Sequence, residues 1–468
     1  MSAVNVKIIV SVGPASSREE VISRMVALGV SGFRINFAHG SRETWSRYVE
    51  LVRGVERSSG RYVSLIGDVV GPSLRLGQLE KPLDVARGTV VRFLLQGKQL
   101  PDLGTRGPVI PVDVPPTVLQ ELSSGDTVLM DDGRISFTIV EVGDGYFDAL
   151  AQTDSVLSSR KAFTVKGKEF NLPILSRKDV EDVEFACRSG FDYIGLSYVR
   201  TAEDVQQVRK VTERMGCDIG ILAKIETLSA LRNLDSIIEV SDGVVVARGD
   251  LGMNLGLEKL PSVQKRIVRR CRELGKPVIV ATQLLESMRE NPVPTRSEVV
   301  DVYEAVVSGV DALMLTGETS VGKYPVEVVR WLSRIVRAAE GSSPPTVERY
   351  VADLRTRFVK GVVELAEDLG ATIAIYSMRG RTARRVSAMR PRVPVYVGVP
   401  TIEEARKLSI LWGLSVFVIE ASNYAEGLEK LYKHLTSSGL LRVNDIVVLA
   451  YGFIEEHEEV IKIRRVTV

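Results

Sequence analysis

Short runs of β-branched and other apolar residues recur along the chain, and most are followed by a polar loop and an amphipathic helical pattern. Uninterrupted apolar runs of this length, alternating with helical patterns, are typical of parallel strands buried on both faces. Eight such units favour a closed (β/α)8 TIM barrel, whose chemistry lies at the carboxyl ends of its strands. An open doubly wound sheet remains an alternative, because strand number alone does not establish closure. The predicted strands are residues 7–12, 32–36, 62–67, 193–197, 220–224, 243–247, 277–282 and 311–316.

The alternation breaks after the third predicted strand. Residues from 73 to 168 carry few helical signals and many turns, and short runs at 89–93 and 135–142 predict antiparallel strands. We interpret this stretch as a small β-barrel domain inserted in a loop of the large barrel, where it would act as a lid.

A second break lies at the linker-like stretch 341–345. Beyond it, apolar runs at 372–376, 395–397, 415–418 and 446–449 again alternate with helical patterns and predict a C-terminal α/β domain. The expected fold class is therefore α/β with three domains. Their expected limits are 1–72 and 169–343 for the two parts of the barrel, 73–168 for the inserted domain, and 344–468 for a C-terminal domain with a regulatory or interface role.

Composition and charge exclude several classes of protein. The 468 residues carry a net charge of +2 with both signs spread along the chain, which argues against nucleic acid as a partner, because its groove needs a basic face. The chain has no uncharged apolar run of about 18 residues and no signal-peptide pattern at its start, so we expect a cytoplasmic protein without membrane contact. Asn and Gln are scarce, as in many heat-stable proteins. The cysteines Cys187, Cys217 and Cys271 are far apart, and we expect reduced thiols with no disulfide or zinc site.

Charged residues gather where the fifth and sixth predicted strands end. Strand alternation places Lys224 and Glu226 on one face, and Asp250 follows the next strand. Two carboxylates at adjacent strand ends suit a hard cation that keeps several waters, as Mg²⁺ does. Lys224 beside them would neutralise a phosphoryl group or an enolate. For an isolated Lys-x-Glu pair, however, a salt bridge that fills the barrel is the more common explanation.

The other strand ends weaken that structural explanation. They carry Arg34, Asp68, Arg75, Thr282 and Thr316. Gly249 and Asp250 begin a predicted helix whose free amides would hold a substrate carboxylate. Cations, acids and hydroxyls at one barrel mouth imply a metal and an anionic substrate, and a phosphorylated carboxylic acid fits.

Seven segments of the chain resemble the signatures of the pyruvate kinase family, in the order in which that family has them. They are residues 11–16, 34–40, 223–226, 246–252, 281–288, 294–298 and 315–319. The likeness spans the whole chain, including the position of the inserted domain. It implies an enzyme that transfers the phosphoryl group of phosphoenolpyruvate to ADP, giving pyruvate and ATP in the last step of glycolysis, with Mg²⁺ or alternatively Mn²⁺.

The resemblance also implies roles for single residues. Lys224 would stabilise the phosphoryl and enolate charge, Arg34 would bind the phosphate, and Thr282 would lie near the enolate carbon, where a water relay delivers the proton. These three, with Gly249 and Asp250, would bind the substrate. Glu226 and Asp250 would hold Mg²⁺. The implied nucleotide-binding residues are Asn36, His39, Arg75 and Lys178; for His39, a loop histidine bonded to backbone is an equal alternative.

Two features depart from the family pattern at its K⁺ site. That site uses Asn, Ser, Asp and Thr, and the equivalents here are Asn36, Ala38, Asp68 and Val69. Both hydroxyl ligands are absent. Asn36 and Asp68 remain as side-chain ligands, with backbone oxygens as an alternative source, and we expect turnover without K⁺. Where K⁺-dependent members carry Glu and K⁺-independent members often carry Lys, this chain has Ser73, and the source of the compensating charge stays open.

The C-terminal domain departs from members activated by a sugar bisphosphate. Acidic residues at 455–459 would repel such an effector. A basic helix start would instead bind a smaller phosphorylated metabolite, unless it is merely a solvated helix face. Its candidate residues are Arg379, Arg381, Thr382 and Arg384. From the resemblance we also expect a homotetramer.

Two other functions remain open. One is a different metal-dependent barrel enzyme acting on an enolpyruvate, such as an aldolase or mutase; the nucleotide-side residues argue against it. The other is a non-catalytic, metabolite-binding regulator, which the presence of Lys224, Glu226, Asp250, Arg34 and Thr282 makes the weaker interpretation.

Overall fold

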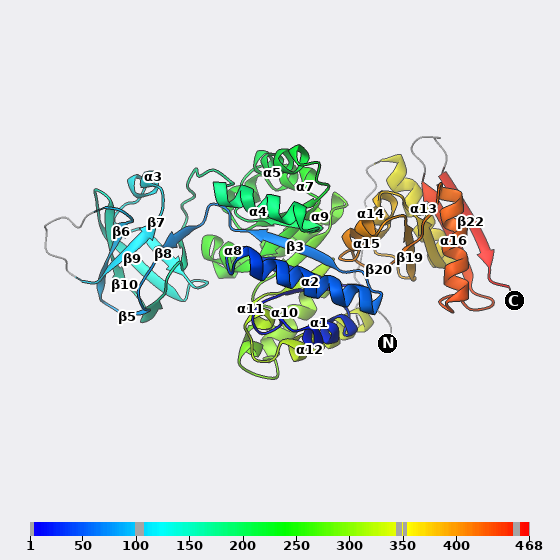
Figure 1. The fold of residues 1–468 in the computed structure, drawn as a ribbon, viewed down its shortest axis with the longest axis horizontal. Coiled ribbons are helices and arrows are strands. Elements are labelled where there is room, and N and C mark those ends of the chain that lie inside the picture. Colours follow the sequence, from blue (N-terminus) through cyan, green and yellow to red (C-terminus); the bar gives the residue numbers. More distant parts are fainter. Residues whose placement is uncertain (1–3, 99–106, 343–348, 350–352, 453–458, 468) are drawn as a thin grey trace.

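Three domains follow one another along the long axis of the molecule (Figure 1). The computed structural model describes residues 4–98, 107–342, 349, 353–452 and 459–467. A large barrel occupies the centre, with the inserted domain at one end and the C-terminal domain at the other.

Eight parallel strands close the central barrel in the order β1-β17-β16-β15-β14-β13-β3-β2. The predicted closed barrel is confirmed, and the open sheet is excluded. Five of the strands are buried along their whole length, as strands covered on both faces must be. The strands are β1 (Lys7–Ser11), β2 (Val30–Asn36), β3 (Ser64–Val69), β13 (Tyr193–Leu196), β14 (Gly220–Ile225), β15 (Gly243–Ala247), β16 (Val278–Ala281) and β17 (Ala312–Leu315).

Several of the helices around the barrel begin or end at ordinary capping residues. The longest N-terminal helix starts after Ser41, whose side chain accepts a hydrogen bond from Thr44 N, and ends at Gly60 in a left-handed conformation. Capping boxes at Ser176 and Thr295 start two others. The helices are α1 (Glu19–Ala27), α2 (Arg42–Ser59), α4 (Arg177–Arg188), α5 (Ala202–Arg214), α6 (Leu228–Arg232), α7 (Leu234–Val240), α8 (Arg248–Leu255), α9 (Leu260–Glu273), α10 (Arg296–Val307), α11 (Gly317–Ser320) and α12 (Pro325–Ser342), with short 3-10 turns η1 (Leu257–Lys259) and η2 (Glu286–Arg289).

The inserted domain is a second closed barrel, with strand order β10-β6-β7-β4-β12-β8-β9, so the predicted β-barrel insertion is confirmed. Phe93, Phe137 and Phe147 pack together in its core. Its elements are β4 (Leu74–Leu76), β5 (Leu83–Val85), β6 (Val90–Leu95), β7 (Val109–Asp113), α3 (Pro116–Gln120), β8 (Thr127–Met130), β9 (Ile135–Gly143), β10 (Tyr146–Ala151), β11 (Ser155–Leu157) and β12 (Ala162–Val165).

The C-terminal domain is a five-stranded sheet in the order β20-β19-β18-β21-β22 with helices packed on it. Its edge strand β22 pairs antiparallel to β21. It was not predicted, because most of its residues are exposed and four of its seven residues are charged. The elements are α13 (Leu354–Asp368), β18 (Thr372–Tyr376), α14 (Arg381–Ala388), β19 (Val395–Val399), α15 (Ile402–Leu408), β20 (Leu414–Val418), α16 (Tyr424–Ser437), β21 (Ile446–Gly452) and β22 (Glu459–Arg465).

The C-terminal domain closes the amino-terminal end of the barrel. Ile410 packs into the apolar cluster inside the barrel, beside Ile9 and Ile66. Arg390 Nη2 donates to Asp311 Oδ2 at 2.7 Å across the interface, and both side chains are almost fully buried. The chemistry-bearing ends of the strands are therefore left to face the inserted domain.

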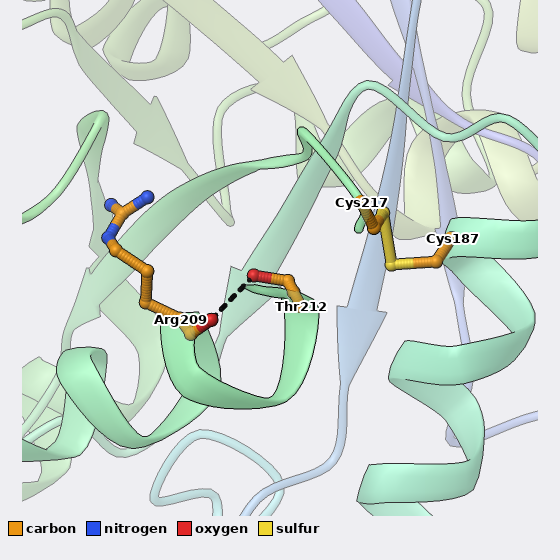
Figure 2. The surroundings of a disulfide bond; sticks show 4 residues. All are labelled: Cys187, Arg209, Thr212 and Cys217. Atoms are coloured by element: carbon orange, nitrogen blue, oxygen red, sulfur yellow. Dashed lines mark hydrogen bonds between the residues drawn. A yellow bond between two sulfur atoms is a disulfide. The ribbon is translucent and has the colours of Figure 1, made fainter. Parts of the chain in front are cut away.

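The expectation of reduced cysteines is wrong for two of the three. Cys187, at the end of α4, and Cys217, between α5 and β14, form a disulfide with a Cα–Cα distance of 5.8 Å (Figure 2). They are 30 residues apart in sequence, and only the packing of α4 beside α5 brings them together. Cys271 is a free, buried cysteine, and burial raises the pKa of its thiol. Among the described residues, no helix combines the length and apolar character of a membrane span.

Candidate active site

The carboxyl ends of the barrel strands and the inserted domain enclose a large cavity with about 2080 Å³ of free space, open to solvent. Of the residues predicted to bind substrate, nucleotide or cation, all but Gly249 line it. They are Arg34, Asn36, His39, Asp68, Arg75, Lys178, Lys224, Glu226, Asp250 and Thr282. Thr316 and, from the inserted domain, Asp131, Asp132 and residues 158–162 also line it.

Four charged side chains form a compact cluster in this cavity. Arg34 Nε and Nη2 donate to Asp68 Oδ2 at 2.9 and 2.6 Å. Lys224 Nζ lies 3.5 Å from Asp68 Oδ2 and 3.6 Å from Glu226 Oε2, and it donates to Ser197 Oγ at 2.9 Å. Lys224 and Glu226 are thus an ion pair without a hydrogen bond between them, and Lys224 is shared with Asp68 and Ser197.

Glu226 carries an unsatisfied buried oxygen. The residue is fully buried, and no described residue makes a hydrogen bond to its Oε2. Burial, opposed by Lys224 and reinforced by the charge of Asp250, raises the pKa of Glu226 to about 7. Lys224 Nζ lies 3.6 Å from this oxygen without donating to it, and a buried carboxylate oxygen that lacks a hydrogen bond is costly. A cation bound at Oε2 would remove that cost.

The neighbouring charges favour an ionised Lys224 and Asp68. Burial disfavours the charged form of each, but their mutual attraction and the guanidinium of Arg34 lower the pKa of Asp68. Despite burial, Asp68 and Glu226 raise the pKa of Lys224. The cluster therefore presents two fixed cations, Arg34 and Lys224, to an anionic substrate.

Tyr198 contacts both of the carboxylates predicted to hold a metal. Its backbone N–H donates to Glu226 Oε1 at 2.6 Å, and its hydroxyl donates to Asp250 Oδ1 at 3.2 Å. Burial and the two carboxylates raise the pKa of the Tyr198 phenol well above its usual value, so the hydroxyl remains a donor. Sequence reasoning missed this residue, although it directly follows the fourth predicted strand, 193–197.

The turn after β16 places Thr282 against the start of α8. Thr282 and Gln283 have positive φ angles of 69° and 50°, and Arg248 holds the turn by donating to both of their carbonyl oxygens. Thr282 Oγ1 accepts a hydrogen bond from Gly249 N at 3.0 Å. The predicted helix start at Gly249 is confirmed, since α8 spans Arg248–Leu255.

The inserted domain reaches this same turn with Asp132, which sequence reasoning did not single out. A Cβ atom on Gly249 would lie 2.5 Å from Asp132 Oδ1, so a larger residue there would displace the Asp132 carboxylate. Burial and the charge of Asp250, opposed by a hydrogen bond with Gln283, raise the pKa of Asp132.

The predicted nucleotide-side residues lie around the rim of the cavity. Arg75 Nε donates to Ser73 Oγ at 2.9 Å, and Lys178 Nζ donates to Asp182 Oδ2 at 2.5 Å. Asn36 Oδ1 accepts from Ala38 N at 3.0 Å. Burial, with the nearby charges of Arg75 and Arg34, lowers the pKa of His39. His39 is therefore neutral at physiological pH, while the rim itself is basic.

The four effector candidates lie at α14, away from this cavity. Arg379 and Arg381 are exposed. Arg384 instead reaches the base of the barrel, where its Nη1 lies 3.5 Å from the hydroxyl of Tyr193. The acidic stretch invoked against a bisphosphate falls mostly in 453–458, outside the described residues.

Comparisons with known proteins assign the chain to a protein family. Residues 3–329 match the family model "Pyruvate kinase, barrel domain", and residues 357–464 match "Pyruvate kinase, alpha/beta domain". The chain belongs to the pyruvate kinase family. A pyruvate kinase of Pyrobaculum aerophilum is 41% identical over 429 residues, which cover 91% of each chain. One of Aeropyrum pernix is 39% identical over 463 residues, 98% of each chain.

A solved structure agrees with the pyruvate kinase assignment. The crystal structure of pyruvate kinase from Pyrobaculum aerophilum superposes with a TM-score of 0.87 and 38% identity, covering 99% of this chain and 100% of that one. The chain is accordingly a phosphotransferase that acts on phosphoenolpyruvate and ADP. The family uses a divalent metal. The aldolase, mutase and regulator alternatives are set aside.

Proposed function

We propose that the cavity at the barrel mouth carries out phosphoryl transfer with Mg²⁺ held by Glu226 and Asp250, and that Mn²⁺ can replace it. The observation that carries this proposal is the buried Glu226 Oε2 that lacks a hydrogen bond within the described part of the chain. In the same part, no three His, Cys, Asp or Glu side chains form a metal-binding group. A cation here would take its other ligands from water and substrate, which is the manner of Mg²⁺. When bound, it would neutralise charge on the substrate's oxygens.

The protein's own residues would divide the remaining work. Arg34 and Lys224 would bind the transferring phosphoryl group, and Lys224 would also balance the enolate charge left on the product. The amide of Asp250 at the start of α8 would hold the substrate carboxylate, and the Gly249 amide would join it by exchanging its hydrogen bond to Thr282 Oγ1 for one to the substrate. Thr282, beside Gly249, would orient the water that delivers a proton to the enolate carbon.

We place ADP at the basic rim, with Asn36, His39, Arg75 and Lys178. Support comes from their position in the lining of the cavity, to which Arg75 is contributed by β4 of the inserted domain. A closed inserted domain would exclude water, so that transfer to ADP outcompetes hydrolysis.

We further propose turnover without K⁺. Of the residual site, Asp68 Oδ2 already accepts two hydrogen bonds from Arg34, and Asn36 Oδ1 accepts one from backbone. Arg75, which donates to Ser73, places a cation beside the position where a K⁺-independent relative often carries Lys. It is our candidate for the compensating charge.

Other features of the sequence remain proposals. We propose a cytoplasmic homotetramer with domain limits at 1–72, 73–168, 169–343 and 344–468. We also propose allosteric control by a phosphorylated metabolite bound by Arg379, Arg381, Thr382 and Arg384. Arg384 would have to leave the hydroxyl of Tyr193 to join that site. A cytoplasmic location is compatible with the disulfide, because intracellular proteins of hyperthermophiles are often rich in disulfides.

The deciding experiment measures pyruvate formation from phosphoenolpyruvate, ADP and Mg²⁺ in buffer free of Na⁺ and K⁺, and again after K⁺ is added. We expect full turnover before K⁺. A strong rise on adding K⁺ would keep the enzyme and refute the cation proposal. Lys224→Met should lose activity while it still binds substrate, and Lys323→Met, at an exposed surface pair, is the matched control. An active Lys224→Met variant would refute the assigned role.

A further inference from the structure

Tyr198 connects two neighbouring carboxylates through two different donors. The backbone N–H holds one oxygen of Glu226 at 2.6 Å, and the side-chain hydroxyl holds one oxygen of Asp250 at 3.2 Å. Neither hydrogen bond involves the second oxygen of its carboxylate. Each carboxylate is thus oriented through one oxygen and retains one for another ligand. For Glu226 that oxygen is the buried Oε2, to which no described residue makes a hydrogen bond, although Lys224 Nζ lies 3.6 Å from it.

The backbone of Tyr198 is held in an unusual conformation that serves this contact. Its φ angle is 57°, in the left-handed region that bulky residues rarely occupy. Such conformations persist where surrounding contacts require them, and they cluster at functional sites. Here the preceding residue is fixed: Ser197 Oγ donates to Val69 O at 2.8 Å, and Gly71 packs so closely that an added Cβ would lie 2.8 Å from Ser197 O. The turn after β13 therefore aims the Tyr198 N–H at Glu226.

We propose that Tyr198 is a positioning residue that limits Glu226 and Asp250 to one metal-binding oxygen each, and so makes the site selective for small divalent ions. This inference rests on the proposed Mg²⁺ site. Mg²⁺ requires a compact octahedral shell in which a carboxylate supplies one oxygen, whereas the larger Ca²⁺ accepts six to eight ligands and readily takes both oxygens of a carboxylate. An Asp250 released from the tyrosine hydroxyl can rotate and offer both.

The test is cation binding to the full-length protein without substrates. Mn²⁺ binding is followed by electron paramagnetic resonance, and Mg²⁺ and Ca²⁺ are titrated as competitors. Tyr198→Phe removes the hydroxyl and keeps the backbone N–H. Tyr193→Phe is the matched control, because it removes another buried tyrosine hydroxyl, which donates to Lys407 O at the base of the barrel. Circular dichroism verifies that both variants fold.

In Tyr198→Phe we expect the Mg²⁺ affinity to fall about tenfold, as is usual when a partner of a metal ligand is lost. The Ca²⁺ affinity should change by no more than about threefold, because Ca²⁺ gains from two-oxygen binding. The preference for Mg²⁺ over Ca²⁺ would therefore shrink, and Tyr193→Phe would leave it unchanged. If Tyr198 had a merely structural role, its substitution would lower the affinity for both ions alike.

Two results would overturn the inference, and only the second would also refute the proposed metal site. If Tyr198→Phe binds both ions as the wild type does, or loses affinity for both equally, Tyr198 does not set selectivity, although the metal site stands. If Glu226→Gln leaves Mn²⁺ binding intact, the cation is not held by these carboxylates, and the proposed metal site fails as well.

Discussion

Loss of the Cys187–Cys217 disulfide should destabilise the barrel by several kcal/mol without affecting the chemistry. The bond closes a loop of 30 residues. In the chain-entropy description, a loop of this length lowers the entropy of the unfolded chain by an amount worth about 3.6 kcal/mol at 25 °C. Measured effects are usually about 2–4 kcal/mol, so we expect a loss in that range for the variant Cys187→Ser/Cys217→Ser.

The position of the bond explains why activity should survive. Cys187 ends α4 and Cys217 precedes β14, so both lie at the amino-terminal end of the barrel strands. The cavity with Lys224 and Glu226 lies at the opposite end. We therefore expect an unchanged kcat at 25 °C but a melting temperature lower by roughly 10 °C, from about 2–4 °C for each kcal/mol in a domain of this size.

The assay compares guanidinium unfolding midpoints and thermal melts of the two proteins with and without reductant. Reductant should lower the stability of the wild type to that of the double variant and leave the variant unchanged. Thiol titration of the denatured, non-reduced wild type should detect one cysteine, Cys271. Three reactive thiols, or a wild-type midpoint that reductant does not move, would refute the reasoning.

Three further predictions test other contacts. Gly249→Ala would place a methyl carbon 2.5 Å from Asp132 Oδ1. We expect kcat/KM for phosphoenolpyruvate to fall about tenfold or more while the melting temperature stays unchanged. Unchanged kinetics would contradict the contact. Burial lowers the pKa of Lys7 to about 8, whereas the unfolded chain keeps this proton to about pH 10.4. The unfolded state therefore binds more protons in that window, and the stability of wild type relative to Lys7→Met should rise between pH 8 and 10. The urea midpoints of the two proteins are compared across this range, and a difference that stays constant with pH would disprove the prediction. Arg390→Ala strands a buried carboxylate and should cost about 3–5 kcal/mol, whereas Lys98→Ala, at an exposed pair, should cost less than about 1 kcal/mol; equal losses would count against the buried pair.

Local patterns were sufficient for the parts of the fold that depend on neighbouring residues in sequence. Buried parallel strands are apolar on both faces, so β14 and β15 could be located from composition alone. Strand alternation correctly places Lys224 and Glu226 on one side of β14, and both line the cavity. The exposed edge strand β22 has no such pattern, and it escaped prediction for that reason.

Contacts between distant segments were decided only by the closed fold. The pairing of Cys187 with Cys217, the approach of Asp132 to Gly249, and the two hydrogen bonds of Tyr198 all depend on which elements become neighbours and at what angle. The left-handed backbone at Tyr198 also contradicts its local preference, so no residue-by-residue reading would suggest it.

The sequence by itself thus determines the strands, the domain pattern and the kinds of charge at each strand end. These features follow from hydrophobic periodicity and from side-chain chemistry. Folding in three dimensions determines the pairing of those charges. Arg34 reaches Asp68 because β2 lies beside β3, and Glu226 keeps an unsatisfied oxygen because burial removes water from it. Distance and dielectric environment are properties of the packed protein, and the linear sequence has neither.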